Sequence, residues 1–185
     1  MSDSSQQPTP VPAVDRVHDP ARLAALRETG WLDTAAEAPL DQLAQLAARL
    51  VDAPTALISL VDADRQFFKA AVGVEGPLKT RRETPLRYSF CRYAVDSGAP
   101  FVVADAEHHP VVRDNPAVEE LGVRAYAGVP LVTPEGHALG TLCVTDTEPR
   151  EWSPKQIQTL EELASSIMES LEKRVAMRRA GDLDD

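Results

Sequence analysis

Two cysteines, Cys91 and Cys143, are the residues of this 185-residue chain best suited to covalent chemistry. Ser89 is expected to cap a short helix over residues 90–96, which places the Cys91 thiol in the first helical turn. The positive end of the helix dipole and the adjacent Arg92 would favour the thiolate, the reactive form of cysteine. A redox-reactive or electrophile-reactive site would use such a thiol. The alternative, which we favour, is a purely structural role in which Cys91 is a small buried apolar residue, as free cysteine commonly is.

Cys143 lies in a predicted strand over residues 138–146. It shares one face of that strand with Thr141, while Leu142 and Val144 take the other face. The larger apolar pair would suit a helix-covered core, and the Thr–Cys face would suit a pocket with small polar groups. Close packing on both faces is the favoured alternative.

Other polar side chains offer weaker sites. Asp105, His108 and His109 could be metal ligands, but a solvated loop in which Asp105 accepts backbone hydrogen bonds is the expected arrangement. Arg65 and Arg124 could face an anionic ligand. Ion pairing at the surface is the alternative, and it is preferred for Arg65.

Aromatic residues could line an apolar pocket in which a tyrosine supplies a polar group. Phe68, Phe90, Phe101 and Tyr126 are the candidates, and ordinary core packing explains the phenylalanines equally well. The candidate ligand-binding residues are Phe68, Phe90, Cys91, Asp105, Arg124, Tyr126, Thr141 and Cys143. No catalytic residue and no metal ligand is assigned.

The elements that would position these residues follow from hydrophobic periodicity and from turn residues. Asp19-Pro20 begins a helix that ends near Gly30, and a second helix covers residues 41–51. The other predicted elements are strands over 55–62, 65–72, 101–104, 125–132 and 138–146, a loop over 73–84, a helical turn or two over 116–121, and a last helix over 154–179. Tight hairpins between strands predict antiparallel pairing, and therefore an α+β fold.

Charge and composition exclude several partners. The net charge of -10 argues against nucleic acid and against anionic lipid surfaces. No apolar run reaches the roughly 20 residues of a membrane span, and the N-terminus lacks the features of a secretory signal. A cytoplasmic protein is therefore expected. The sequence leaves open whether Cys91 and Cys143 form a disulfide, although a permanent one is not expected in the cytosol.

The domain boundaries follow the same patterns. Residues 1–17 are rich in Ser, Gln and Pro and are expected to form a disordered tail, and residues 180–185 a frayed acidic one. One domain covers residues 18–179, including a long C-terminal helix over 153–179. In this helix Ile157, Leu160, Ala164, Ile167 and Leu171 have the spacing of a coiled-coil seam. A homodimer through this helix is expected, with an intramolecular amphipathic helix as the alternative.

Three sequence blocks, in this order, resemble the GAF family of small-molecule sensor domains. They are Ser-Phe-Cys at residues 89–91, Tyr-Ala-Gly-Val-Pro-Leu at 126–131, and Gly-Thr-Leu-Cys-Val at 140–144, followed by Asp146. The resemblance covers roughly residues 22–174 and is typical of a bacterial signalling branch. It implies a central antiparallel sheet of five or six strands. The N- and C-terminal helices would cover one face, and a ligand pocket would open on the other.

The resemblance also allows known GAF specialisations to be compared with this chain. Bilin-binding members usually hold a Cys-His pair, whereas Cys91 is followed by Arg92. The four histidines lie in a tail, a loop and a turn, which does not support haem, and the Asn-Lys-Phe-Asp-Glu motif of cyclic-nucleotide binders is absent. The free methionine sulfoxide reductases of the family need a cysteine that residues 118–132 lack. No cofactor is assigned.

The resulting hypothesis is a stand-alone GAF-type sensor or regulatory domain that is not an enzyme. An unidentified small molecule would bind the pocket, shift the terminal helices and alter a dimer or partner interface. The alternative is a thiol-based redox sensor, or an enzyme similar to methionine sulfoxide reductases, that uses Cys91. A third possibility is an interaction module whose pocket is collapsed.

Overall fold

The computed structural model describes residues 15–181, which form one six-stranded antiparallel sheet with strand order β3-β2-β1-β6-β5-β4. The strands are β1 Thr55–Val61, β2 Arg65–Val72, β3 Glu83–Pro85, β4 Phe101–Val103, β5 Ala125–Val132 and β6 Ala138–Asp146. The helices are α1 Pro20–Glu28, α2 Ala38–Leu50, α3 Pro77–Arg81, α4 Cys91–Ser97, α5 Pro116–Glu120 and α6 Pro154–Arg179, with short 3-10 turns at Leu86–Tyr88 and Ala106–His108. The predicted α+β class with a central antiparallel sheet is confirmed.

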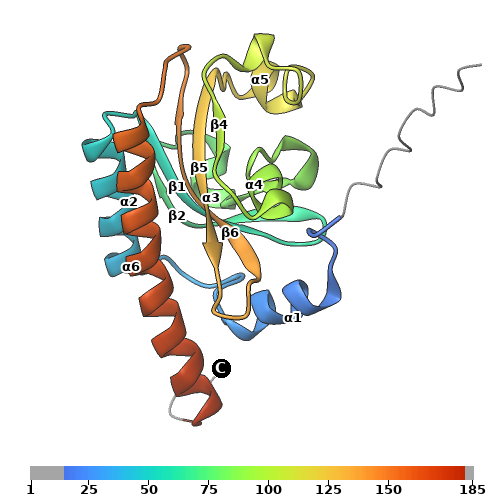
Figure 1. The fold of residues 1–185 in the computed structure, drawn as a ribbon, viewed down its shortest axis with the longest axis vertical. Helices are drawn as coiled ribbons and strands as arrows, with labels where there is room; N and C mark the ends of the chain where they lie inside the picture. The colour runs from blue at the N-terminus through green and yellow to red at the C-terminus, as the bar shows by residue number, and fades with distance from the viewer. Residues whose placement is uncertain (1–14, 182–185) are drawn as a thin grey trace, which may run out of the picture.

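Helices cover both faces of this sheet (Figure 1). The helices α2 and α6 lie side by side on one face, whereas α4 and α5 lie on the other. Helix α1 lies near the lower end of the sheet in Figure 1 and contacts β6. The predicted arrangement, with terminal helices on one face and a different set of elements on the other, is therefore present.

The apolar stripe of α6 packs on the sheet. Leu160, Ala164, Ile167 and Leu171 are buried in the core that α2, α6 and the sheet share, and Ile157 packs against this core. The coiled-coil-like spacing thus serves intramolecular packing, which was the alternative for this helix. A homodimer through α6 stays a prediction.

The alternation predicted for β6 is confirmed. Leu142 and Val144 belong to the core beneath α2 and α6, while Cys143 belongs to a second apolar cluster under α4. Phe90 and Tyr126 are buried in this second cluster. A strand whose two faces carry different side chains thereby separates a helix-packed core from the opposite layer.

Two local expectations differ from the structure. The segment 73–84, expected to be a loop, contains α3 and most of β3. Strand β3 pairs with β2, with Thr84 opposite Gln66. A three-residue strand is too short to show a hydrophobic period, so no pattern marks it. Helix α2 begins at Ala38 rather than at residue 41, because Pro39 occupies its first turn, where a missing N–H costs nothing.

Ordered packing begins before residue 18. Val17 is fully buried, and its backbone N–H donates to Asp96 Oδ1 at 3.1 Å. Arg22 is 2 % exposed, and its guanidinium donates to the backbone carbonyls of Arg16, Val17, Val61 and Ala138. Residues 1–14 and 182–185 of the two expected tails lie outside the described residues.

No helix among residues 15–181 combines the length and the apolar character that crossing a membrane requires. The cytoplasmic location stays a prediction.

Candidate functional site

A cavity of about 370 Å³ opens on the sheet face opposite α2 and α6. Strands β1, β2, β5 and β6 supply its floor, and α4, α5 and the segments around α3 supply its walls. Its size falls in the range of small-molecule sites. Phe68, Phe90, Cys91, Tyr126 and Cys143, all predicted from the sequence, line this cavity.

A row of polar side chains crosses the sheet beside these aromatic residues. Gln66 Nε2 donates to Thr84 Oγ1 at 2.8 Å, and Ser59 Oγ donates to Gln66 Oε1 at 3.4 Å. All three residues are buried, and Gln66 and Thr84 line the cavity. The cavity therefore combines an apolar wall with amide and hydroxyl groups that could orient a ligand.

Cys91 is the centre of a buried cluster of thiols and hydroxyls. Its sulfur lies 3.8 Å from Cys143 Sγ, and it accepts hydrogen bonds from Thr141 Oγ1 at 3.1 Å and from the Tyr126 hydroxyl at 3.3 Å. As predicted, Cys91 lies in the first turn of a helix. The N-cap residue is Phe90 rather than the expected Ser89, although Ser89 Oγ accepts a hydrogen bond from the Arg92 N–H. Thr141, Tyr126 and Cys143, three of the predicted site residues, thus converge on a fourth.

These contacts shift the acidity of the two thiols in opposite directions. The hydrogen bond with Cys143 is the main cause that lowers the pKa of Cys91, and Thr141 and Tyr126 add to it against the effect of burial. The same hydrogen bond, together with burial, raises the pKa of Cys143 well above its usual range. Cys91 is therefore the more acidic of the two thiols.

Tyr126 holds its hydroxyl over the thiols because the strand leaves room for it. A Cβ atom at Gly128 would lie 2.1 Å from the Tyr126 hydroxyl oxygen, so glycine permits this position of the ring. Phe90 packs edge-on against the ring at 5.4 Å between centroids. Burial raises the pKa of Tyr126 well above its usual range, so the phenol stays protonated and donates to Cys91.

The charges around the cavity have one sign. Glu75, Glu120 and Asp146 line it, and no lysine or arginine belongs to the lining within residues 15–181. The hydroxyl of Tyr88 donates to Glu120 Oε2 and so connects two parts of the wall. Phosphate and other anions bind where arginine or lysine can pair with them. This cavity is suited instead to a neutral or cationic molecule.

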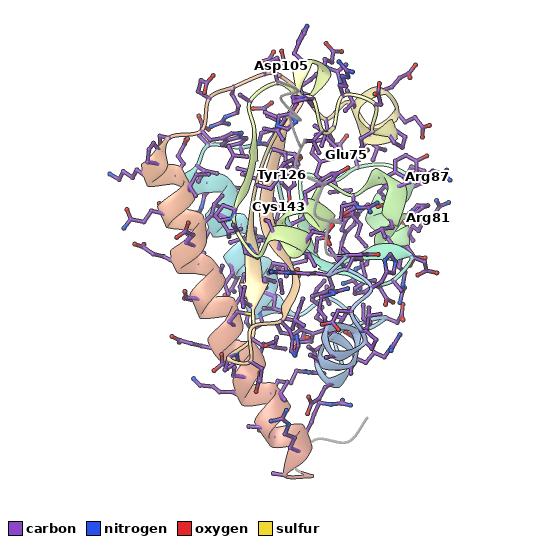
Figure 2. The ribbon with its side chains drawn as sticks, turned by 45° about the vertical axis from the view of Figure 1, so that its right-hand side comes forward. Glu75, Arg81, Arg87, Asp105, Tyr126 and Cys143 are labelled. Carbon is purple, nitrogen blue, oxygen red and sulfur yellow. The ribbon has the colours of Figure 1, made fainter. Side chains whose placement is uncertain are left out.

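Three predicted site residues, Asp105, Arg124 and Thr141, lie outside the cavity lining, although Thr141 contacts Cys91 beside it. Asp105 accepts a hydrogen bond from the Glu107 N–H at 3.2 Å and contacts His108 Nδ1 at 2.8 Å, as expected for a residue that organises a loop. Figure 2 shows it at the upper edge of the molecule, apart from Tyr126 and Cys143. Arg124 donates to Val118 O at 2.6 Å and pairs with Glu107 at 2.9 Å. The side chains of Asp105 and Arg124 are engaged in local contacts away from a ligand.

Sequence reasoning missed several lining residues. Gln66 lies two positions before Phe68 in β2 and therefore on the same strand face, which was the available signal. Thr84, Tyr88, Glu75 and Glu120 lie in short or irregular segments, for which no periodic pattern exists.

Comparison with known proteins identifies the family. Residues 36–171 match the GAF domain family. The chain belongs to the GAF domain family. The match extends from the start of α2 into the last turns of α6 and so includes every strand and the whole cavity. The resemblance seen in the three sequence blocks is confirmed, and the family is typically one of signalling and sensor domains.

Individual relatives of this GAF domain include enzymes and sensors. It is 40% identical over 150 residues to the cyclic di-GMP phosphodiesterase PA2567 of Pseudomonas aeruginosa, a match that covers 80% of this chain and 25% of that protein. Its fold resembles the free methionine-R-sulfoxide reductase of Neisseria meningitidis (24% identity, TM-score 0.58, 88% of each chain). It also resembles the GAF domain of an Acinetobacter phosphoenolpyruvate-protein phosphotransferase (16% identity, TM-score 0.58, 89% of this chain and 99% of the other).

These relatives correct one expectation. The sequence-based hypothesis that the protein is not an enzyme is wrong, because a relative at 40% identity is named a cyclic di-GMP phosphodiesterase. The GAF domain spans about a quarter of the length of the curated relatives it matches. The stand-alone arrangement stays a prediction.

Proposed function

We propose that this GAF domain is a regulatory sensor that binds a neutral or cationic small molecule in the cavity above β1, β2, β5 and β6. The observation that carries the proposal is the composition of the cavity lining. Phe68, Phe90 and Tyr126 offer apolar surface, Gln66 and Thr84 offer hydrogen bonds, and the charged residues of the lining are acidic. The match to PA2567 supports a role beside an enzyme of cyclic di-GMP metabolism.

The proposed signal passes through the sheet. Cys143 faces the cavity, whereas its neighbours Leu142 and Val144 pack beneath α2 and α6. A ligand that moves β5 or β6 would therefore change the packing of α6, which contacts both strands. A shift of α6 would alter the contact with an enzyme or with a second copy of the chain.

Native mass spectrometry tests this function directly. The protein purified from its native host is expected to carry a mass under gentle conditions that is lost on denaturation. Leu121 is 42 % exposed and lines the cavity, so Leu121→Trp should narrow the entrance and weaken retention of that mass by at least about tenfold, or about 1.4 kcal/mol.

Leu50→Trp is the matched control, because Leu50 is 57 % exposed on α2, across the sheet from the cavity. Retention of the mass should be unchanged in this variant. A bare protein that also shows no thermal shift with any neutral or cationic metabolite would contradict the proposal, and so would a bound molecule that carries phosphate groups.

A second candidate is reduction of a sulfoxide by Cys91. The proximity of an acidified thiol to the cavity favours it. In this reaction the sulfoxide oxygen would leave as water, and thioredoxin with NADPH would supply the two electrons. NADPH consumption with free methionine sulfoxide, lost in Cys91→Ser and retained in Arg92→Lys, is the expected result. An absence of turnover in the wild-type protein would end this candidate.

A further inference from the structure

The two cysteines of the chain lie together although 52 positions separate them. Cys91 comes from the first turn of α4 and Cys143 from the middle of β6. Their sulfur atoms are 3.8 Å apart, and both side chains line the cavity. A pair of thiols at this separation, beside a cavity, has the geometry for reaction with a molecule that enters from solvent.

The burial of the pair limits what can reach it. Cys91 is 3 % exposed and Cys143 is 0 % exposed, so the sulfurs are accessible only through the cavity. Hydrogen peroxide is near water in size, and a cavity of about 370 Å³ admits it.

We propose that Cys91 and Cys143 form a peroxide-reactive dithiol site, in which Cys91 attacks and Cys143 resolves. Thr141 and Tyr126 donate hydrogen bonds to Cys91 Sγ, which assigns the attacking role to that sulfur. Cys143 stays a neutral thiol in contact with it. The reaction of this site with peroxide requires no sensor ligand in the cavity.

The reaction has two steps. The Cys91 thiolate attacks one oxygen of hydrogen peroxide, the O–O bond breaks, and the departing hydroxide takes up the proton that the thiol had released, which yields Cys91 sulfenic acid and water. The Cys143 sulfur then attacks the Cys91 sulfur, the S–O bond breaks, and hydroxide leaves with the Cys143 proton as a second water. The two sulfurs together lose two electrons, which the peroxide accepts.

Formation of the disulfide would reshape the cavity. The sulfur atoms must approach each other by about 1.8 Å to reach bonding distance. This movement draws the start of α4 toward β6 and removes the thiolate that accepts from Thr141 and Tyr126. Oxidation would thus change the wall and the floor of the cavity together.

Intact mass and peptide mapping of the reduced wild-type protein, with and without hydrogen peroxide, test the proposal. We expect the loss of two hydrogen atoms and of both free thiols, with recovery on addition of dithiothreitol. Peptide mapping separates this change from oxygen added to the three methionines. In Cys143→Ser the Cys91 sulfenic acid should persist and react with dimedone. In Cys91→Ser the Cys143 thiol should be oxidised at least about tenfold more slowly than in the wild-type protein.

The pH profile distinguishes the role of Cys91 from a structural one. In the wild-type protein the oxidation rate should rise with pH through a midpoint below the value of about 8.5 for a free thiol. Thr141→Val removes one donor to the thiolate, so the midpoint should move upward while the rate at alkaline pH recovers. Wild-type protein that stays reduced at peroxide doses that oxidise free cysteine, or that links Cys91 to another chain rather than to Cys143, would overturn the proposal.

Discussion

Gly140→Ala is expected to lower the free energy of unfolding by at least about 3 kcal/mol, because β1 leaves no room for a side chain there. A Cβ atom at residue 140 would lie 1.9 Å from the carbonyl oxygen of Ser59 and 2.8 Å from Leu60 Cα. Both atoms are backbone, so relief requires β1 and β6 to separate at the centre of the sheet. Urea unfolding followed by circular dichroism measures the loss.

Gly128→Ala is the matched comparison for this substitution. Its Cβ would also meet atoms at short distance, with 2.1 Å to the nearest, but these belong to the side chain of Tyr126. Rotation of that side chain relieves the contact, so the expected loss is about 1 kcal/mol, together with loss of the hydrogen bond to Cys91. Equal stability losses in the two variants would contradict this account of the β1–β6 contact.

Arg22→Met is expected to lower the free energy of unfolding by about 3–5 kcal/mol. The guanidinium is 2 % exposed, and its partners include the buried carbonyls of Val61 and Ala138 at 2.7 and 3.2 Å. Methionine fills part of the space but donates no hydrogen bond, so several carbonyls lose their partner inside the protein. Denaturant unfolding at neutral pH measures the difference.

Arg27→Met provides the control on the same helix. Arg27 is exposed in the last turn of α1, so its replacement should change stability by no more than about 0.5 kcal/mol. Similar stabilities of the two variants would mean that water can replace the guanidinium at the carbonyls, and that Arg22 does not hold the N-terminal segment to the sheet.

The sequence by itself determined most of the secondary structure. Asp19-Pro20 marked the start of α1, because a capping side chain and a proline in the first turn satisfy or remove N–H groups that lack helical partners. Ser153 and Pro154 begin α6 in the same way. The alternation of β6 assigned Cys143 to one face and Leu142 to the other, since successive residues of a strand point in opposite directions. These are local rules, and they held where an element was long enough to show a period.

Tertiary structure alone decided which of these faces and side chains meet. The sheet order places β6 between β1 and β5, and only this order brings Cys143 beneath Cys91 of α4. The charged side chain of Lys69 is fully buried because Glu37, far away in the sequence, pairs with it at 2.6 Å. Asp105 and Arg124 were equally plausible site residues by type, but loop geometry gave both local partners. Residue type and spacing restrict what a side chain can do, whereas its partners depend on contacts between distant segments, which local periodicity does not encode.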